Sequence, residues 1–570
     1  MMNGAEALIN SLIWEGVDTV FGYPGGQIIS VYDKLYDYTD KINHILVRHE
    51  QGAVHAAQGY ARCSGKTGVV IVTSGPGAAN VVTGLADALM DSTPLVVISG
   101  QVASAFLGTD AFQEADVVAM TQQVTKWAIQ IRRAEDIPMA VARAFYIAST
   151  GRPGPVVLDI SKDAQTGMVD WKHKSCRFIR SYNPEPVIDS RLVQVAADLL
   201  NNAYHPMILA GHGVTISRAE KELRDIAEKA SIPVGLTLLG LSSFPTDHPL
   251  NFGMLGMHGN LAANMATHQA DVILAVGMRF DDRVTLDLNH YAKGAKIIHV
   301  DIDSSELNKN VPAEVAVNAD ARMFLTELLP LLVSRNTNAM KDLQERCYSV
   351  ENEKIISGQV NPGKGILKMA EVVDTVSSLA PENSVCVTDV GQNQMFSARY
   401  FRFRKPKSFI SSGGLGTMGF GLPAAIGAKI SSPEREVILF VGDGGLQMTV
   451  EELGTIMQYG VGVKIVLLNN DFLGNVRQWQ KLFFNGRFSQ TPMTNPDFVK
   501  LAEAYGISAA RVTERECLED AVKDMLEHKG AYLLEVAVDP TDMIFPMIPA
   551  GGRIDRIMLD SETVFTFNNI

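Results

Sequence analysis

The chain has 570 residues, of which 46% are hydrophobic and 20% are charged, and its formal net charge is −13. This length predicts about three domains, each large enough to bury its own core. The acidic balance argues against an electrostatic nucleic-acid binder, which would present a basic face.

The N-terminal segment, MMNGAEALINSLIWEGV, predicts an amphipathic helix and not a signal peptide, because it has no basic start and no long apolar core. The sequence contains no run of 18 or more apolar residues, so we expect no membrane span. Its five cysteines are scattered without a CxxC pair, which is typical of reduced thiols. Together these features predict a cytoplasmic protein.

Short β-branched apolar runs alternate with segments of helical period along the whole chain; examples are HILV, GVVIVT, PVVLDI, DVILAVG and EVILFVGDG. This alternation predicts an α/β fold of βαβ units with doubly wound parallel sheets. Polar stretches near 170–190 and 335–365 predict domains at 1–175, 185–345 and 360–545, followed by a tail at 546–570. The tail begins with FPMIPAGG, whose prolines and glycines disfavour regular structure, and we consider it a candidate lid.

In the first predicted domain, Glu50 follows the strand run HILV and begins a helix of small residues, AVHAAQGYA. A lone glutamate at a helix start ordinarily complements the helix dipole. Here FGYPGG (21–26) precedes it and TSGPGAAN (73–80) follows it. In the second predicted domain, Gly211 and Gly213 follow the strand PMILA, where small residues allow the backbone of a dinucleotide to come close.

The third predicted domain contains the most informative pattern. A buried strand run ends in Gly442-Asp443-Gly444-Gly445, a helical segment follows, and the next strand, KIVLL, ends in Asn469-Asn470. Ligands collect at the carboxyl ends of strands in open α/β sheets. Magnesium prefers hard oxygen ligands, and Asp443, the amide of Asn470 and a main-chain carbonyl near Phe472 can supply them. The glycines and the following helix N-terminus suit a phosphate.

These motifs resemble those of thiamine-diphosphate-dependent enzymes, and the resemblance to the acetolactate synthase family covers nearly the whole chain. It is carried by FGYPGG, RHEQGA, TSGPGA, GTDAFQEAD, GRPGPVVLDISKD, GMLGMHG, GMRFDDRV, SSGGLGTMGFGLPAA and VRQWQ. GMLGMHG, MRFDDR and HVDID resemble the biosynthetic, FAD-containing type. The resemblance implies two thiamine-diphosphate-binding domains, one for the pyrimidine ring and one for the diphosphate, flanking a Rossmann-like FAD domain.

The resemblance also implies roles for individual residues. Glu50 would activate the cofactor through its aminopyrimidine ring, and Met418 would bend the cofactor into its V shape. Asp443, Asn470 and Phe472 would bind Mg²⁺. Other thiamine-diphosphate contacts would come from Pro76, Asn80, Gly391, Gln392, Asn393, Gly416, Gly442, Gly444, Gly445 and Gly474. Flavin contacts would come from Arg152, Gly211, Gly213, Met257, His258, Gly277, Arg279, Asp301 and Asp320.

The resemblance further assigns the substrate channel. Gly26 would line the thiazolium ring, Arg283 would hold the carboxylate of the second 2-oxo acid, and Trp479 would shape the pocket for its alkyl group. Phe112, Gln113, Lys162 and Met257 would complete the channel. The sequence departs from the family's common residues at Asn393, Asn475, Ser161 and Gly445, but none of these changes removes Glu50 or an expected metal ligand.

The implied reaction is that of an acetolactate synthase in branched-chain amino-acid biosynthesis. It decarboxylates pyruvate on thiamine diphosphate and ligates the resulting hydroxyethyl carbanion to pyruvate or to 2-oxobutyrate. The alternatives are an FAD-dependent pyruvate oxidase and a cofactor-binding paralogue without turnover. Because the two ends of the cofactor bind to different domains in the family, we expect a homodimer or homotetramer with the active site at the interface. The sequence leaves open whether a small regulatory subunit binds.

Overall fold

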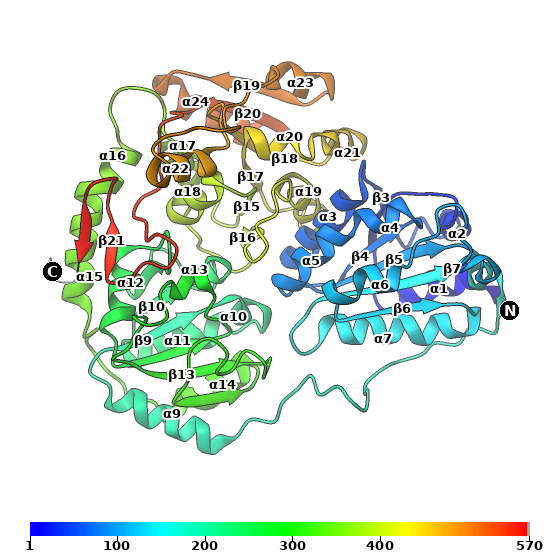
Figure 1. Ribbon diagram of the computed structural model, residues 1–570, viewed down its shortest axis with the longest axis horizontal. Helices are drawn as coiled ribbons and strands as arrows, with labels where there is room; N and C mark the ends of the chain where they lie inside the picture. Colours follow the sequence, from blue (N-terminus) through cyan, green and yellow to red (C-terminus); the bar gives the residue numbers. More distant parts are fainter. Residues whose placement is uncertain (567–570) are drawn as a thin grey trace.

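The computed structural model describes residues 1–566, which form three six-stranded, fully parallel sheets with helices on both faces (Figure 1). This arrangement confirms the predicted α/β fold with three doubly wound domains. Half of the strands in these sheets are buried along their whole length, and the central strands β17 (Val437–Gly442) and β18 (Val463–Asn469) are buried except at their last residue, as the continuous apolar runs predict for sheets covered on both faces. Among residues 1–566 the structure has no helix that is both long enough and apolar enough to cross a bilayer.

The N-terminal domain has the strand order β3-β2-β4-β5-β7-β6. Its strands are β2 (Thr19–Gly22), β3 (Asn43–Leu46), β4 (Gly68–Val72), β5 (Leu95–Gln101), β6 (Trp127–Ile131) and β7 (Pro155–Ser161). Its helices are α1 (Gly4–Trp14), α2 (Ile29–Tyr36), α3 (Glu50–Ser64), α4 (Pro76–Asn80), α5 (Val82–Met90), α6 (Val117–Thr121), α7 (Ile137–Ser149) and α8 (Lys162–Thr166). Helix α1 is the amphipathic helix that the N-terminal pattern predicts.

The middle domain has the order β11-β10-β9-β12-β13-β14, so that its first and fourth strands are neighbours at the centre, as in a dinucleotide-binding sheet. Its strands are β9 (Pro206–Ala210), β10 (Val234–Leu236), β11 (Asn251–Met254), β12 (Val272–Val276), β13 (Lys296–Asp301) and β14 (Val315–Asn318). Its helices are α9 (Ser190–Asn202), α10 (His212–Ile216), α11 (Glu220–Ala230), α12 (Leu261–Gln269), α13 (Asp282–Thr285) and α14 (Ala321–Leu328).

The C-terminal domain has the order β16-β15-β17-β18-β20-β19, which repeats the topology of the N-terminal domain strand for strand. Its strands are β15 (Val385–Thr388), β16 (Phe409–Ile410), β17 (Val437–Gly442), β18 (Val463–Asn469), β19 (Ser508–Val512) and β20 (Tyr532–Ala537). Its helices are α17 (Met369–Leu379), α18 (Gln392–Tyr400), α19 (Gly421–Ser431), α20 (Asp443–Gln447), α21 (Leu453–Tyr459), α22 (Gly474–Phe483), α23 (Phe498–Ala504) and α24 (Leu518–Glu527).

The segments between the domains follow the predicted breaks in part. Residues 170–189 contain no helix or strand and run as an extended linker from the N-terminal to the middle domain (Figure 1). The second predicted break instead contains helices α15 (Lys341–Glu351) and α16 (Ser357–Val360). Helix α15 packs on α12 of the middle domain and continues past the predicted boundary at 345.

The C-terminal tail packs against the middle domain. Its first part has no regular element, as predicted, but a short antiparallel hairpin follows, β21 (Arg556–Met558) with β22 (Val564–Thr566). Met547, Ile548 and Ile557 join the apolar core under α12, and the Ile548 amide donates to the Met257 carbonyl at 2.8 Å. The last four residues of the predicted tail lie outside the described part of the chain.

Helices α3 and α19 hold the N-terminal and C-terminal domains together. They are equivalent elements, since each follows the second strand of its sheet, and they lie side by side where the two domains meet (Figure 1). A Cβ on Gly59 would lie 1.9 Å from the Ala424 carbonyl oxygen, and a Cβ on Gly427 would lie 1.8 Å from the Ala56 carbonyl oxygen. The two backbones therefore touch at a crossing where each helix needs glycine.

This crossing predicts that Gly427→Ala lowers the stability of the chain. The added methyl group must push the Ala56 backbone away, and overpacking of this kind costs about 1–3 kcal/mol. We expect a lower apparent Tm by circular dichroism. The control is Gly358→Ala in α16, where an added Cβ meets nothing within 4 Å, so its Tm should stay the same or rise. Equal Tm values for the two variants would contradict this account of the crossing.

Candidate functional site

Glu50, the predicted activating residue, is the first residue of α3 and lies at the carboxyl end of β3. It is half-buried, and Asn80 Nδ2 donates to its Oε2 at 2.9 Å. Its Oε1 lies 3.3 Å from the position that a Cβ on Gly77 would occupy. The Oε2 atom of Glu50 is therefore held by the Asn80 amide, whereas the space next to Oε1 stays open because Gly77 has no side chain.

The other predicted residues of this domain lie in the loops around Glu50. Pro76 opens α4, the short helix that ends in Asn80. Gln113 has a φ of 60°, and its backbone packs against Gly75. A Cβ on Gly75 would lie 3.0 Å from the Gln113 Cα atom. Lys162 Nζ donates to the Gly26 carbonyl at 2.8 Å. Phe112 is exposed.

Asp443 and Asn470, the predicted metal ligands, stand at the carboxyl ends of the neighbouring strands β17 and β18. Burial raises the pKa of Asp443 to about 6. Asn495 Nδ2 donates to Asp443 Oδ2 at 2.7 Å and also lies within hydrogen-bond distance of the side-chain oxygens of Asn469 and Asp471. Asn495 thus fixes the candidate ligand from a segment that the sequence motifs do not include.

Asn470 is oriented by two hydrogen bonds. Its Nδ2 donates to Gln392 Oε1 at 3.3 Å, and its Oδ1 accepts from the Phe472 amide at 3.2 Å. Residues 1–566 contain no group of three or more His, Cys, Asp or Glu side chains suited to a metal. The candidate site would therefore combine one carboxylate with an amide oxygen and a main-chain carbonyl, a hard-oxygen set that suits Mg²⁺ when phosphate oxygens and water complete the shell.

Glycines surround this candidate metal site. Gly391 precedes α18 with φ of 125°, and a Cβ on Gly474 would lie 2.1 Å from Gln392 Oε1. A Cβ on Gly442 would lie 3.5 Å from Asn393 Nδ2, and a Cβ on Gly444 would lie 3.7 Å from the Met418 methyl group. The Asn393 Oδ1 atom is buried without a hydrogen-bond partner.

Asp389, which the motif analysis did not select, shapes the loop that carries Met418. Its buried carboxylate accepts from the Gly421 amide at 2.8 Å and from the Gly419 amide at 3.0 Å. Burial raises its pKa. A Cβ on Gly445 would lie 2.4 Å from Asp389 Oδ1, so glycine at 445 is required for this packing.

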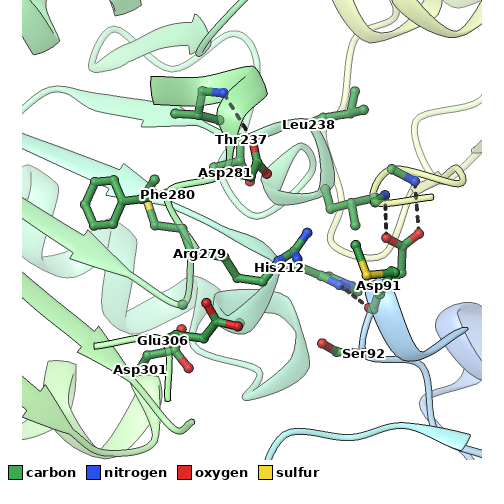
Figure 2. Close-up of a pocket in the computed structure, with 18 of the residues that line it drawn as sticks. Asp91, Ser92, His212, Thr237, Leu238, Arg279, Phe280, Asp281, Asp301 and Glu306 are labelled. Carbon is green, nitrogen blue, oxygen red and sulfur yellow. Dashed lines mark hydrogen bonds between the residues drawn. The ribbon is translucent and has the colours of Figure 1, made fainter. Parts of the chain in front are cut away.

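A large cavity of about 990 Å³ lies where the three domains meet, and Figure 2 shows part of its wall. It collects most of the predicted flavin residues, together with two further predicted substrate residues, Arg283 and Trp479, and one predicted thiamine-diphosphate contact, Gly416. Those lining it are Arg152, Gly213, Met257, His258, Gly277, Arg279, Arg283, Asp301, Asp320, Gly416 and Trp479. Gly211 is not among the lining residues, because its role is packing: a Cβ there would lie 2.2 Å from the Gly277 carbonyl oxygen.

The polar groups of this cavity fit a dinucleotide. Asp301 ends β13, and burial raises its pKa to about 6. Arg152 Nη1 forms an ion pair with Glu306 at 2.7 Å. His258 Nδ1 and Trp479 Nε1 are buried without hydrogen-bond partners. A cavity of this size with an acidic strand end, a glycine turn and unpaired polar atoms has room and donors for a flavin dinucleotide.

The predicted residues therefore form three groups, and the structure does not join all of them. The flavin group, with Arg283 and Trp479, shares one cavity. The hydrogen bond that Glu50 receives comes from its own domain, and in the described part of the chain no hydrogen bond or ion pair links Glu50 to Asp443 or Asn470. The two halves of the predicted thiamine site thus belong to separate domains.

Several residues that line the cavity were not selected as site residues from the sequence; they are Asp91, Ser92, His212, Thr237, Leu238 and Asp281. In Figure 2, Asp91 and Ser92 reach the cavity from the N-terminal domain, whereas Asp301 and Glu306 lie on the middle domain. Thr237 and His212 each lie just after a buried strand, so strand-end position is a signal that could have selected them. Asp91 and Ser92 reach the cavity only because two domains pack together.

Comparison with known proteins gives a consistent result along the chain. Residues 2–120, 193–328 and 389–536 match family models described as the N-terminal TPP binding domain, the central domain and the C-terminal TPP binding domain of thiamine pyrophosphate enzymes. The acetolactate synthase isozyme 2 large subunit of Escherichia coli is 45% identical over 98% of this chain and 99% of its own length.

Two further relatives show the same extent of likeness. The probable acetolactate synthase large subunit of Methanocaldococcus jannaschii is 44% identical over 98% of this chain and 95% of its own length. The acetolactate synthase large subunit of Buchnera aphidicola subsp. Schizaphis graminum is 44% identical over 99% of this chain and all of its own.

The hydrogen bond from Asn495 to Asp443 generates a prediction about metal binding. Asn495→Ala should weaken Mg²⁺ binding about 10–100-fold, because residues that orient a ligand contribute that much to metal affinity. The measurement is calorimetric titration of Mg²⁺ with thiamine diphosphate present. Asn202→Ala is the control, since the Asn202 side chain donates only to the Asp198 carbonyl of its own helix. Unchanged Mg²⁺ affinity in Asn495→Ala would show that Asp443 is positioned without it.

Proposed function

The chain belongs to the acetolactate synthase large-subunit family of thiamine pyrophosphate (thiamine diphosphate) enzymes, and we propose how its own residues carry out that reaction. Two pyruvate anions and one proton give 2-acetolactate and carbon dioxide, and 2-oxobutyrate in place of the second pyruvate gives 2-aceto-2-hydroxybutyrate. The observation that carries the assignment is that the Glu50–Asn80 pair and the Asp443–Asn470 pair occur on equivalent domains of one full-length family member.

When bound, thiamine diphosphate supplies the thiazolium carbon that attacks the keto carbon and the ring that accepts the electrons of the lost carboxylate. Glu50 would act at the aminopyrimidine end. Asn80 holds Oε2, so that Oε1 beside Gly77 is the oxygen that is free to exchange a proton with a ring nitrogen.

Magnesium would be held by Asp443, Asn470 and the Phe472 carbonyl. Burial raises the pKa of Asp443 to about 6, and a bound Mg²⁺ would neutralise the charge of its carboxylate. The glycines at 391 and 442 leave room for the diphosphate to come close, and the Asn393 Nδ2 amide beside them is a donor that phosphate oxygens can accept from.

The acceptor substrate would bind at the edge of the large cavity. The Arg283 guanidinium is 57% exposed and has only a long 3.7 Å contact with Asp282, so it is available for a bidentate bond to a 2-oxo acid carboxylate. Trp479 lines the same cavity and packs against the apolar cluster of the middle domain, where it would bound the alkyl group.

We propose that FAD fills the large cavity, with Gly213 at the phosphates and Asp301 at a ribose hydroxyl. The ligation reaction transfers no hydride, so the flavin would serve to organise the walls to which all three domains contribute. Removing it should disorder those walls and reduce turnover.

The active site would form between two copies of the chain. Exposed apolar side chains stand beside the predicted cofactor loops, with Phe112 at 84%, Met448 at 55% and Leu415 at 44% exposure. A second copy that brings its Glu50 to the Asp443 half would cover such side chains. The large-subunit names of the relatives also support a small-subunit partner for this chain.

The test is an anaerobic assay with pyruvate, Mg²⁺ and thiamine diphosphate, with and without FAD. We expect acetolactate with FAD and little product without it. Acetate or acetyl phosphate that appears only with oxygen would overturn the synthase assignment in favour of a flavin-dependent pyruvate oxidase.

Glu50→Gln should still bind the cofactor but lose turnover by about 10²–10⁴-fold, because an amide can hydrogen-bond the ring but cannot exchange a proton with it. Glu135→Gln is the control, since Glu135 is an exposed carboxylate of the same domain. Cofactor binding is measured by calorimetry and turnover by acetolactate formation. Near-normal turnover in Glu50→Gln would remove Glu50 from the mechanism.

A further inference from the structure

Helix α3 carries a row of polar side chains, buried or partly buried, to which the proposed reaction gives no role. Gln51, His55, Gln58 and Arg62 are spaced by four, three and four residues, so they lie on one face of the helix. His55 and Gln58 are fully buried, and the Arg62 side chain is 6% exposed. The row begins at the residue after Glu50 and ends about 16 Å away at Arg62, which contacts the cavity-lining residue Asp91.

These side chains form a continuous hydrogen-bonded chain. Gln51 Nε2 lies 3.3 Å from His55 Nε2, and Gln58 Nε2 lies 3.3 Å from His55 Nδ1. Arg62 Nη2 donates to Gln58 Oε1 at 3.1 Å and to Asp91 Oδ2 at 2.9 Å. We call this set, from Gln51 to Asp91, the α3 polar chain.

Between Arg62 and Gln51, the hydrogen bonds of the α3 polar chain all donate in one direction, toward Gln51. The Gln58 amide is fixed because Oε1 accepts from Arg62 and Nε2 also donates to the Gly84 carbonyl at 3.3 Å. Gln58 therefore donates to His55 Nδ1. Burial, with the charge of Arg62, lowers the pKa of His55 to about 3, so the ring is neutral and its proton sits on Nε2. His55 Nε2 then donates to the Gln51 side-chain amide through the amide oxygen, in the amide orientation that satisfies both groups.

At the far end, Asp91 receives hydrogen bonds from all three domains. Its carboxylate pairs with Arg62 of the N-terminal domain and accepts from the Gly413 and Gly414 amides of the C-terminal domain, at 2.9 and 2.7 Å. Its main-chain carbonyl accepts from His212 Nδ1 of the middle domain at 3.1 Å. Dashed lines in Figure 2 mark the bonds between Asp91 and its partners in the middle and C-terminal domains.

Glycine is needed where Asp91 meets the C-terminal domain. A Cβ on Gly414 would lie 2.8 Å from Asp91 Oδ1, and a Cβ on Gly413 would lie 2.7 Å from Leu239. This segment lines the flavin cavity through Gly416 and continues to Met418. Asp91 thus touches the cavity wall directly, the Glu50 helix through Arg62, and the Met418 loop through two amides.

A buried ion pair is costly to remove from water and adds little stability compared with apolar packing, so its presence calls for another explanation. A ligand that orders the cavity wall also orders Asp91, and through it both halves of the thiamine site. A second ligand that binds afterwards loses less conformational entropy, because its site is already ordered, and it therefore binds more tightly.

We propose that Asp91 and the α3 polar chain are positioning residues that couple the flavin cavity to the thiamine-diphosphate site, so that each cofactor tightens the binding of the other. The inference rests on the proposed function, since it requires both cofactors to bind. Thermodynamic linkage requires that FAD lowers the Kd of thiamine diphosphate by the same factor by which thiamine diphosphate lowers the Kd of FAD. Couplings of this kind are about 5–150-fold.

The test measures the Kd of thiamine diphosphate at fixed Mg²⁺, with and without saturating FAD, by calorimetry on the full-length protein, and the reciprocal FAD titration by flavin fluorescence. We expect a coupling of at least fivefold in the wild-type chain. His55→Leu breaks the chain without altering a charge and should reduce the coupling below twofold. His55→Gln, which can accept and donate at once, should restore it.

Asp91→Asn should also abolish the coupling. This result is interpreted only if the Tm of the variant shows that it folds. If it does not fold, the two His55 variants alone test the inference. The control is Glu306→Gln on the opposite wall, which should weaken FAD binding yet keep the coupling factor. Equal coupling in wild-type and His55→Leu, or no coupling in the wild type, would overturn the inference while leaving the proposed function intact. Failure of the wild-type chain to bind either cofactor would overturn the proposed function itself.

Discussion

The contact between α3 and α19 is the constraint on which the rest of the structure depends. Gly59 and Gly427 let two helix backbones touch, and each is placed three residues after the alanine whose carbonyl faces the other glycine. Because the N-terminal and C-terminal sheets share one topology, these helices are equivalent elements of the two domains. The positions of both predicted cofactor halves follow from this geometry, since α3 begins at Glu50 and the loop before α19 contains Met418.

Buried carboxylates hold the same interface on both sides of the crossing. Glu452 of the C-terminal domain accepts from the Arg48 and His49 amides just before α3, at 2.9 and 3.1 Å. Asp91 of the N-terminal domain accepts from two glycine amides just before α19. Each acidic side chain satisfies main-chain donors of the other domain that would otherwise be buried without partners, which costs about 1–3 kcal/mol per group. Hydrogen bonds to main-chain amides, and not the burial of apolar area alone, therefore determine how the N-terminal and C-terminal domains pack together.

The large cavity is a consequence of this arrangement. Its walls come from a linker-connected middle domain, from the end of α5 and from the loop before α19, so no single domain encloses it. A ligand in this cavity would touch all three domains, which gives a physical reason for the proposed flavin to be kept by a reaction that does not reduce it. Asp91 lines the cavity and contacts the other two domains, so it is the residue through which we propose that the two cofactor sites are coupled.

The sequence by itself determined the elements and the residues at strand ends. Continuous apolar runs predicted the buried parallel strands, and Asp443 with Asn470 was predicted at adjacent strand ends because parallel strands end at one edge. The family resemblance, carried by short local motifs, added Glu50 and the flavin residues. Only the tertiary structure decided the roles of Asn495, Asp389 and Asp91, the touching of Gly59 and Gly427 with the opposite helix, and the passage of α15 beyond residue 345. These depend on groups far apart in the chain, and a periodic pattern specifies which face of a helix is buried but not which atoms will lie against it.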